Sequence, residues 1–308
     1  MCRALLYLGQ PVLLDDLLFK PDSSLVSQAY MPRMLHLLNL AGFGLMAWDR
    51  DSHEPAMPFR YADTTLPVFD RNLKSLAAKV RADCVLAHVR GVAYSPQVNI
   101  SLQNTHPFCF DGYAVALAHN GDLHRVQEMK DDLLAHVLPE VARRISGTTD
   151  SELIYALLLS RLRDPREGAP PDELIQAVEE TLDIIRQVRA RHGIATSSSV
   201  NLFITTGEAV AAVRYCFDFG CYRTDGAVGI HEANLSYLSL WYTTGREFGL
   251  HEGEWKMIGG EEMASSLLIA SEPLTRDTAT WNEVPEYSLV HGEVRDGRPH
   301  IAVHPLAV

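Results

Sequence analysis

The 308-residue sequence lacks a long apolar run, an excess of basic residues and a dense set of cysteines. No stretch approaches the roughly 20 apolar residues that a membrane-spanning helix needs. The first residues also lack the charged-then-apolar layout of a signal peptide. The net charge of -12 argues against nucleic acid and anionic membranes as partners, because both bind basic surfaces. The sequence therefore predicts a protein that binds neither.

The cysteines are few, odd in number and widely spaced. They are Cys2, Cys84, Cys109, Cys216 and Cys221. This usage favours a reducing cytoplasm over a disulfide framework, so we expect a cytoplasmic protein. The sequence also lacks zinc-ligand spacing, a phosphate-binding loop, a dinucleotide fingerprint and a serine-hydrolase elbow. No motif therefore indicates a metal or a cofactor.

The order of predicted elements favours an α+β layered fold with antiparallel sheets. Apolar patterns predict strands at 3–8, 42–48, 84–89, 113–118, 201–205, 209–215, 237–242, 267–270, 288–294 and 301–303. Helices are expected at 15–19, 70–81, 123–145, 151–163 and 172–191, with proline-rich loop at 50–68 and a tight hairpin at 296–297. No linker is long enough to separate domains, so we predict one domain over 2–308.

Cys2 follows the initiator methionine and is small enough for that methionine to be removed. Removal would leave a thiol and a free α-amine on one residue. An α-amine has a pKa of about 7.7–8.0, so it can accept the thiol proton near neutral pH. The alternative is that Cys2 is an incidental buried residue at the start of a strand.

Two further candidates follow predicted strands. Arg90 ends the strand at 84–89, where its guanidinium could hold a carboxylate in a two-pronged contact. Asn120 and Gly121 follow the strand at 113–118, and a side-chain amide with a backbone N–H can stabilise an oxyanion. Taken alone, the arginine also fits a surface position, and Asn-Gly also fits a tight turn.

Thr149, Asp150 and Glu152 open an apolar-striped helix. Thr149 at the N-cap with Glu152 three residues later matches a capping box. Asp150 is then an acid in the first turn, favourable to the helix dipole. The functional alternative is that the Asp150 carboxylate binds an ammonium group.

Taken together in chain order, these segments resemble class II glutamine amidotransferases, which are N-terminal nucleophile hydrolases. The segments are Met-Cys-Arg-Ala-Leu-Leu-Tyr-Leu-Gly at 1–9, Leu-Ala-His-Val-Arg at 86–90, Asn-Thr-His-Pro-Phe at 104–108, Ala-His-Asn-Gly at 118–121 and Gly-Thr-Thr-Asp-Ser-Glu at 147–152. Gly-Phe-Gly at 42–44 and Ala-Ser-Glu-Pro-Leu-Thr at 270–275 resemble a stand-alone branch. That branch includes γ-glutamyl amidohydrolases of ergothioneine biosynthesis and glutathione breakdown.

The resemblance implies an αββα sandwich of two antiparallel sheets, with catalytic motifs within 2–152 and strands at 200–304 completing the sheets. It also implies that Cys2 forms a thioester with a γ-glutamyl carbonyl while its own amine moves the proton. Asn120 and Gly121 would form the oxyanion hole, and no cofactor would be needed. Arg90 would bind the substrate α-carboxylate and Asp150 its α-ammonium. His106, from the segment at 104–108, is a third expected substrate-binding residue.

The sequence departs from the family pattern near Arg90. Ala93 stands where threonine is usual, Ser95 where glycine is usual, and Ala41 where aspartate is common. The expected activity is hydrolysis of glutamine or a γ-glutamyl conjugate, and these departures leave its substrate open. One alternative is a glutaminase that supplies ammonia to a separate synthase, or that works with a peptidase subunit. Another is a catalytically silent γ-glutamyl-binding module.

Overall fold

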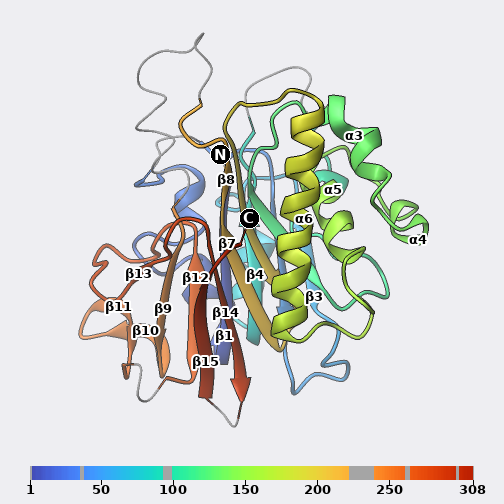
Figure 1. Cartoon of the computed structure of the whole chain (residues 1–308). Coiled ribbons are helices and arrows are strands. Elements are labelled where there is room, and N and C mark those ends of the chain that lie inside the picture. The colour runs from blue at the N-terminus through green and yellow to red at the C-terminus, as the bar shows by residue number, and fades with distance from the viewer. Residues whose placement is uncertain are drawn as a thin grey trace.

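Two antiparallel sheets lie face to face, with helices on their outer surfaces (Figure 1). This computed structural model describes residues 2–34, 38–92, 99–221, 239–260, 264–295 and 298–307. The arrangement confirms the predicted α+β fold with two antiparallel sheets. Within the described residues, no helix is long and apolar enough to cross a bilayer. The extent of a single domain over 2–308 stays a prediction.

The first sheet is built around the N-terminal strand. Its order is β13 (Asn282–Glu283), β9 (Trp241–Gly245), β12 (Ser266–Ala270), β1 (Arg3–Leu13), β4 (Arg81–Val89), β2 (Phe43–Trp48) and β3 (Phe59–Asp63). Along β1, Leu6 and Leu8 face the second sheet, whereas Leu5 and Tyr7 face the outer layer. Both faces of β1 are therefore covered, which explains its continuous apolar run.

The second sheet has the order β15 (Arg298–Pro305), β14 (Ser288–Arg295), β7 (Ala209–Arg214), β6 (Ser198–Thr205) and β5 (Ala116–Gly121). A short strand, β8 (Cys216–Phe217), also pairs with β6, and β10 (Glu247–His251) forms a separate hairpin with β11 (Glu254–Ile258). Ala118 and Phe203 contribute to the core between the sheets, together with Leu6 and Leu86.

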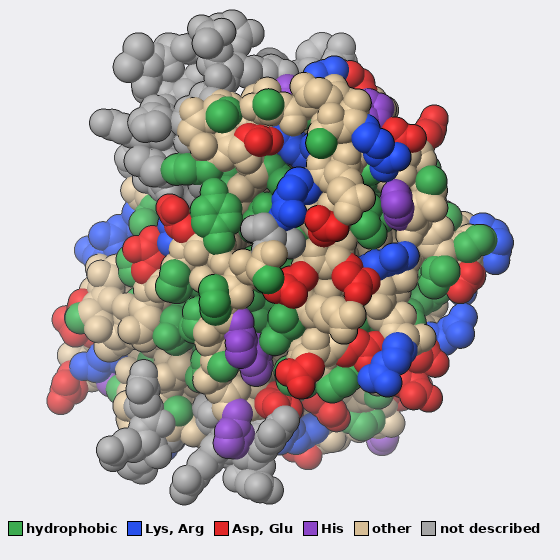
Figure 2. All heavy atoms as spheres, in the orientation of Figure 1, with side chains coloured by type: hydrophobic (Ala, Val, Ile, Leu, Met, Phe, Trp, Pro, Cys, Tyr) green, Lys and Arg blue, Asp and Glu red, His purple; other side chains and the backbone are tan. Residues whose placement is uncertain are grey.

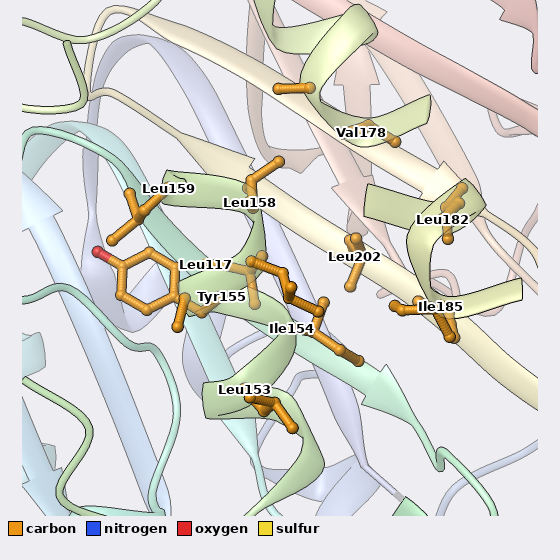
Figure 3. Close-up of a cluster of buried hydrophobic side chains, with 14 of the residues drawn as sticks. Leu117, Leu153, Ile154, Tyr155, Leu158, Leu159, Val178, Leu182, Ile185 and Leu202 are labelled. Atoms are coloured by element: carbon orange, nitrogen blue, oxygen red, sulfur yellow. The ribbon is translucent and has the colours of Figure 1, made fainter. Parts of the chain in front are cut away.

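Helices α3 (Val126–Leu134), α4 (Pro139–Ala142), α5 (Asp150–Leu159) and α6 (Pro171–Arg191) cover the outer face of the second sheet. Ile154 and Leu158 of α5 lie in one cluster with Leu117 and Leu202 of the sheet and Ile185 of α6 (Figure 3).

The opposite outer face carries the short helices α1 (Leu14–Leu18) and α2 (Arg71–Ala77). Single turns of 3-10 helix lie at Ser27–Ala29 and Leu102–Asn104. On the face drawn in Figure 2, acidic and basic side chains are intermixed, with no broad basic area.

Several predicted boundaries are wrong for identifiable reasons. The expected loop at 50–68 contains strand β3, whose residues are mostly exposed at the edge of the sheet and so lack a strong apolar pattern. The expected helix at 123–145 divides into α3 and α4, because Pro139 cannot continue an upstream helix. The helix expected at 70–81 ends at Ala77, since β4 begins at Arg81.

The short strands β8, β10, β11 and β13 were not predicted from the sequence. Strand β6 begins at Ser198, before the start of the strand expected at 201–205. The Asp-Gly turn at 296–297, and part of the strand expected at 237–242, lie outside the described residues. The strands that flank this turn, β14 and β15, do pair antiparallel.

Candidate active site

Cys2 and Arg90 meet at one edge of the first sheet. Strands β1 and β4 are antiparallel, with Arg3 opposite Val89, so the residue before β1 adjoins the residue after β4. Both Cys2 and Arg90 are 6% exposed. The Cys2 Sγ lies 3.4 Å from both the N and the O of Gly91. Strand pairing therefore places the candidate nucleophile beside the candidate carboxylate-binding residue.

Asn120 lies in a strand, which excludes the tight-turn alternative. It is opposite Asn201 in the β5–β6 ladder, and Gly121 is opposite Val200. A Cβ at Gly121 would collide with the Ser199 carbonyl oxygen, so the close approach of β6 requires glycine there. The Asn120 side chain is 1% exposed, and neither its Nδ2 nor its Oδ1 has a hydrogen-bond partner among the described residues. A buried amide without a partner costs free energy and calls for an explanation.

The Asp150 carboxylate anchors the segment that follows β5. Its Oδ2 accepts a hydrogen bond from Leu123 N at 2.7 Å, and its Oδ1 accepts one from Ser151 N at 2.8 Å. The predicted N-cap is confirmed, since Thr149 Oγ1 accepts from Glu152 N at 3.2 Å. The reciprocal half of the capping box is not formed.

Instead, the Glu152 carboxylate accepts hydrogen bonds from the N–H groups of Ser146 and Gly147, at 2.9 and 2.7 Å. Glu152 therefore stabilises the backbone just before α5, at residues 146 and 147, rather than the backbone of the cap residue Thr149. These hydrogen bonds, together with the Thr149 cap, fix the position of Asp150 at the start of α5.

The charges of Arg90 and Asp150 both act on the Cys2 thiol. Burial raises the pKa of the Cys2 thiol, Arg90 opposes that rise, and Asp150 adds to it. Burial also lowers the pKa of Arg90, against the nearby Cys2 and Asp150. Because the thiol pKa is raised, the thiolate is not preformed near neutral pH, and ionisation needs a base.

Arg90 is a buried cation that forms no ion pair among the described residues. Its Nη1 donates to the Asn99 carbonyl at 3.1 Å, which satisfies part of the guanidinium. Burying a charge without a counter-ion is costly. The arrangement therefore fits an anionic ligand at Arg90.

His106 lies in the interior beside a second histidine. Its Nδ1 is 2.9 Å from His88 Nε2, and His88 Nε2 is in turn 3.2 Å from the His119 carbonyl oxygen. His106 is only 3% exposed. The contact expected between His106 and substrate stays a prediction. What the geometry shows is a chain of polar contacts from His106 to the residue preceding Asn120.

Burial keeps both histidines neutral. It lowers the pKa of His88 to about 3 and the pKa of His106 well below 6.5. Unfolded histidines gain protons below about pH 6.5, and these two do not, so folding stability falls as the pH falls. Each histidine then lowers the free energy of unfolding by about 1.4 kcal/mol for each pH unit below about 6.5.

We therefore expect the free energy of unfolding to drop by about 2–3 kcal/mol between pH 5.5 and 4.5 on account of these two groups. Urea unfolding at several pH values measures this slope. The variant His88→Gln/His106→Gln should lose most of it, whatever its stability at neutral pH. An unchanged slope in that variant would show that the histidines titrate normally in the folded protein.

Some contacts at the site carried no signal in the sequence. Asn104 accepts from Thr148 N at 2.8 Å and donates to Thr148 Oγ1 at 3.0 Å, which joins two of the quoted segments. Ala41 N donates to the Arg90 carbonyl at 2.9 Å, so this departure from the family pattern contacts the backbone of Arg90. The departures at Ala93 and Ser95 lie outside the described residues.

Comparisons with known proteins define the class to which the chain belongs. The family described as "Glutamine amidotransferases class-II" matches residues 66–218, which include Arg90, Asn120, Gly121 and Asp150. The chain belongs to the class II glutamine amidotransferase family.

Two relatives match nearly the whole chain. "Probable glutamine amidotransferase DUG3" of Saccharomyces cerevisiae is 29% identical over 310 residues, covering 94% of this chain and 81% of the relative. "Gamma-glutamyl-hercynylcysteine sulfoxide hydrolase" of Mycolicibacterium smegmatis is 26% identical over 311 residues, covering 99% of this chain and 100% of the relative.

Solved structures support the N-terminal nucleophile hydrolase fold. A glutamine aminotransferase class-II domain protein from Silicibacter pomeroyi has a TM-score of 0.61 at 17% identity, with both chains covered fully. Glutamine phosphoribosylpyrophosphate amidotransferase from B. subtilis has a TM-score of 0.56 at 15% identity, with this chain covering 50% of it. At these identities the likeness concerns the fold alone.

Proposed function

We propose that the protein hydrolyses a γ-glutamyl amide through a thioester on Cys2 and releases glutamate. The observation that carries this proposal is a buried thiol under the influence of one cationic side chain, Arg90, and one anionic side chain, Asp150. The α-carboxylate and α-ammonium of a glutamyl group carry the complementary charges. The γ-carbonyl of such a group would then reach the thiol.

The first chemical step needs a base, because burial raises the pKa of the thiol. After removal of Met1, the free α-amine of Cys2 takes the Sγ proton as sulfur attacks the γ-carbonyl carbon. The carbonyl π electrons move onto oxygen, and the tetrahedral intermediate carries an oxyanion. The same amine then returns the proton to the leaving nitrogen as the C–N bond breaks.

The resulting thioester is hydrolysed by water. The α-amine accepts a proton from the water as its oxygen attacks the thioester carbon, and the proton passes to sulfur as the C–S bond breaks. Asn120 and Gly121 stabilise the oxyanion in both halves of the reaction. The buried Asn120 amide has no partner in the part of the chain that the structure describes, and this supports the role, because a developing oxyanion supplies the missing acceptor.

The charges of Arg90 and Asp150 concern the glutamyl part of the substrate, whereas the relatives bear on the leaving group. The fully covered relative from M. smegmatis is named as a hydrolase of a γ-glutamyl conjugate, which supports a conjugate over free glutamine. The relative from S. cerevisiae is named as a glutamine amidotransferase, which favours glutamine. In the latter case a separate synthase or peptidase subunit would be the partner.

Glutamate release from glutamine and a panel of γ-glutamyl amides tests the proposal with purified protein. We expect turnover of conjugates without any added protein. Turnover of glutamine alone would identify a glutaminase and direct the search to a partner. Binding without turnover of any amide would contradict the proposed hydrolysis and identify a γ-glutamyl-binding module.

The variant Asp150→Asn tests the ammonium contact. We expect wild-type protein to prefer a γ-glutamyl amide over its analogue without the α-amino group by roughly 10- to 100-fold in kcat/KM, the scale of a charge-assisted hydrogen bond. The variant should lose most of that preference. It also places an amide near the N–H of Leu123, which now donates to Asp150. This structural effect acts on both substrates and cancels in the ratio of their kcat/KM values. An unchanged ratio in the variant would exclude the ammonium contact.

A further inference from the structure

We propose that Arg3 and Glu272 are positioning residues for Cys2. Their buried ion pair holds the backbone of the nucleophile and joins it to the segment at residues 33–34. This inference rests on the proposed function only in taking Cys2 as the nucleophile.

The regular sheet ends before it reaches Cys2. The β1–β12 ladder stops at Leu5 opposite Ala270. Beyond that point Ser271 forms hydrogen bonds with Ala4. Its Oγ accepts from Ala4 N at 2.9 Å, and its N donates to the Ala4 carbonyl at 3.0 Å. Cys2 itself precedes β1. Its position toward the β12 side is therefore set by side chains rather than by the ladder.

Arg3 supplies that side-chain contact. Its Nη1 donates to the Cys2 carbonyl oxygen at 3.0 Å, and its Nε donates to Glu272 Oε2 at 3.1 Å. The side chains of Arg3 and Glu272 are 3% and 2% exposed. One guanidinium therefore holds the backbone of Cys2 and a fixed buried anion at the same time.

Glu272 is held from a second direction. Its Oε1 accepts from Arg33 N at 2.7 Å, and its Oε2 accepts from Met34 N at 3.2 Å. The Gln28 side chain also donates to the Glu272 carbonyl, at 3.4 Å. The carboxylate thus connects the backbone of the nucleophile to a loop far away in the sequence.

A positioning role explains why the pair is ionic. Burying two charges is costly, and an apolar pair of similar volume is often no less stable. A nucleophile, in contrast, must be held within about half an ångström of its productive place. Once Met1 is removed, no preceding residue holds Cys2, and its carbonyl is the backbone group that Arg3 holds.

The double variant Arg3→Met/Glu272→Leu removes both charges without leaving one buried alone. We expect it to fold, with kcat lowered about 10- to 100-fold and KM changed less than about threefold, because Arg90 and Asp150 remain to bind substrate. Hydrogen exchange of the segment 3–8 should be faster in the variant, and this readout does not depend on any γ-glutamyl chemistry.

The control is Arg50→Met/Asp83→Leu, a more exposed ion pair at the far end of β4, where Arg50 Nε lies 3.3 Å from Asp83 Oδ1. It should leave kcat within about twofold, whatever its effect on the melting temperature. If the Arg3/Glu272 variant fails to fold, Arg3→Lys keeps the positive charge but not the planar fork, and the same fall in kcat is expected.

Wild-type kcat and exchange in a folded Arg3/Glu272 variant, or a rise in KM alone, would overturn the positioning role. Wild-type kcat in Arg3→Lys would overturn it equally. Absence of glutamate release by the wild-type protein from every amide would instead contradict the proposed function, while the exchange comparison would still decide whether the pair orders the N-terminal strand.

Discussion

Replacing Cys2 with alanine is expected to lower glutamate release by at least about 10⁴-fold, the scale seen when a catalytic nucleophile is removed. Cys84 is not expected to take over, because it lies buried between the sheets and its pKa is raised to about 12. Substrate affinity should change little, since Arg90 and Asp150 are retained. Calorimetric titration with a γ-glutamyl amide, beside a glutamate assay, measures both quantities.

Cys109→Ala is the matched control for this experiment. The Cys109 thiol donates to the Tyr113 carbonyl at 3.3 Å and lies near Arg60, so it also sits in a polar setting. We expect kcat within about twofold of wild type. Turnover above 1% of wild type in Cys2→Ala, or loss of turnover in Cys109→Ala, would place the nucleophile elsewhere.

Replacing Asn120 with alanine is expected to lower kcat by roughly 10²–10³, the usual cost of losing one oxyanion donor. KM should change little, because the oxyanion exists only after sulfur has attacked. The melting temperature should not fall. The Asn120 amide has no partner among the described residues, so alanine removes a buried polar group that gains nothing from folding.

Asn201→Ala provides the contrast, because Asn201 lies directly opposite Asn120 in the ladder. Its Oδ1 accepts from Tyr215 N at 3.2 Å and its Nδ2 donates to the Ser239 carbonyl at 3.3 Å. We expect a loss of about 1–3 kcal/mol in stability and a change in kcat below about threefold. A destabilised Asn120→Ala with normal kcat would show that Asn120 is structural.

The role of Thr149 as N-cap could be anticipated from the sequence, since capping depends on neighbouring residues. The proximity of Cys2 and Arg90 could be anticipated only through the family resemblance, because the pairing of β1 with β4 joins segments far apart in the chain.

Contacts that depend on register between sheets could not be anticipated. The approach of His88 to the His119 carbonyl joins β4 to β5 across the sandwich, and nothing in either segment specifies the other. The same holds for Arg3 and Glu272, which lie at opposite ends of the chain. Asn120 was expected beyond its strand, whereas β5 continues through Gly121 because β6 pairs with it.

The central claim is that Cys2, as the first residue of the mature chain, is the nucleophile. Treatment with a glutamine-like diazo ketone, followed by mass spectrometry of the peptides, tests it most directly. The account predicts one label, on the thiol of a peptide that begins with Cys2 and lacks Met1, and protection by a γ-glutamyl amide. A label on Cys84, Cys109, Cys216 or Cys221, or on a peptide that retains Met1, would contradict it.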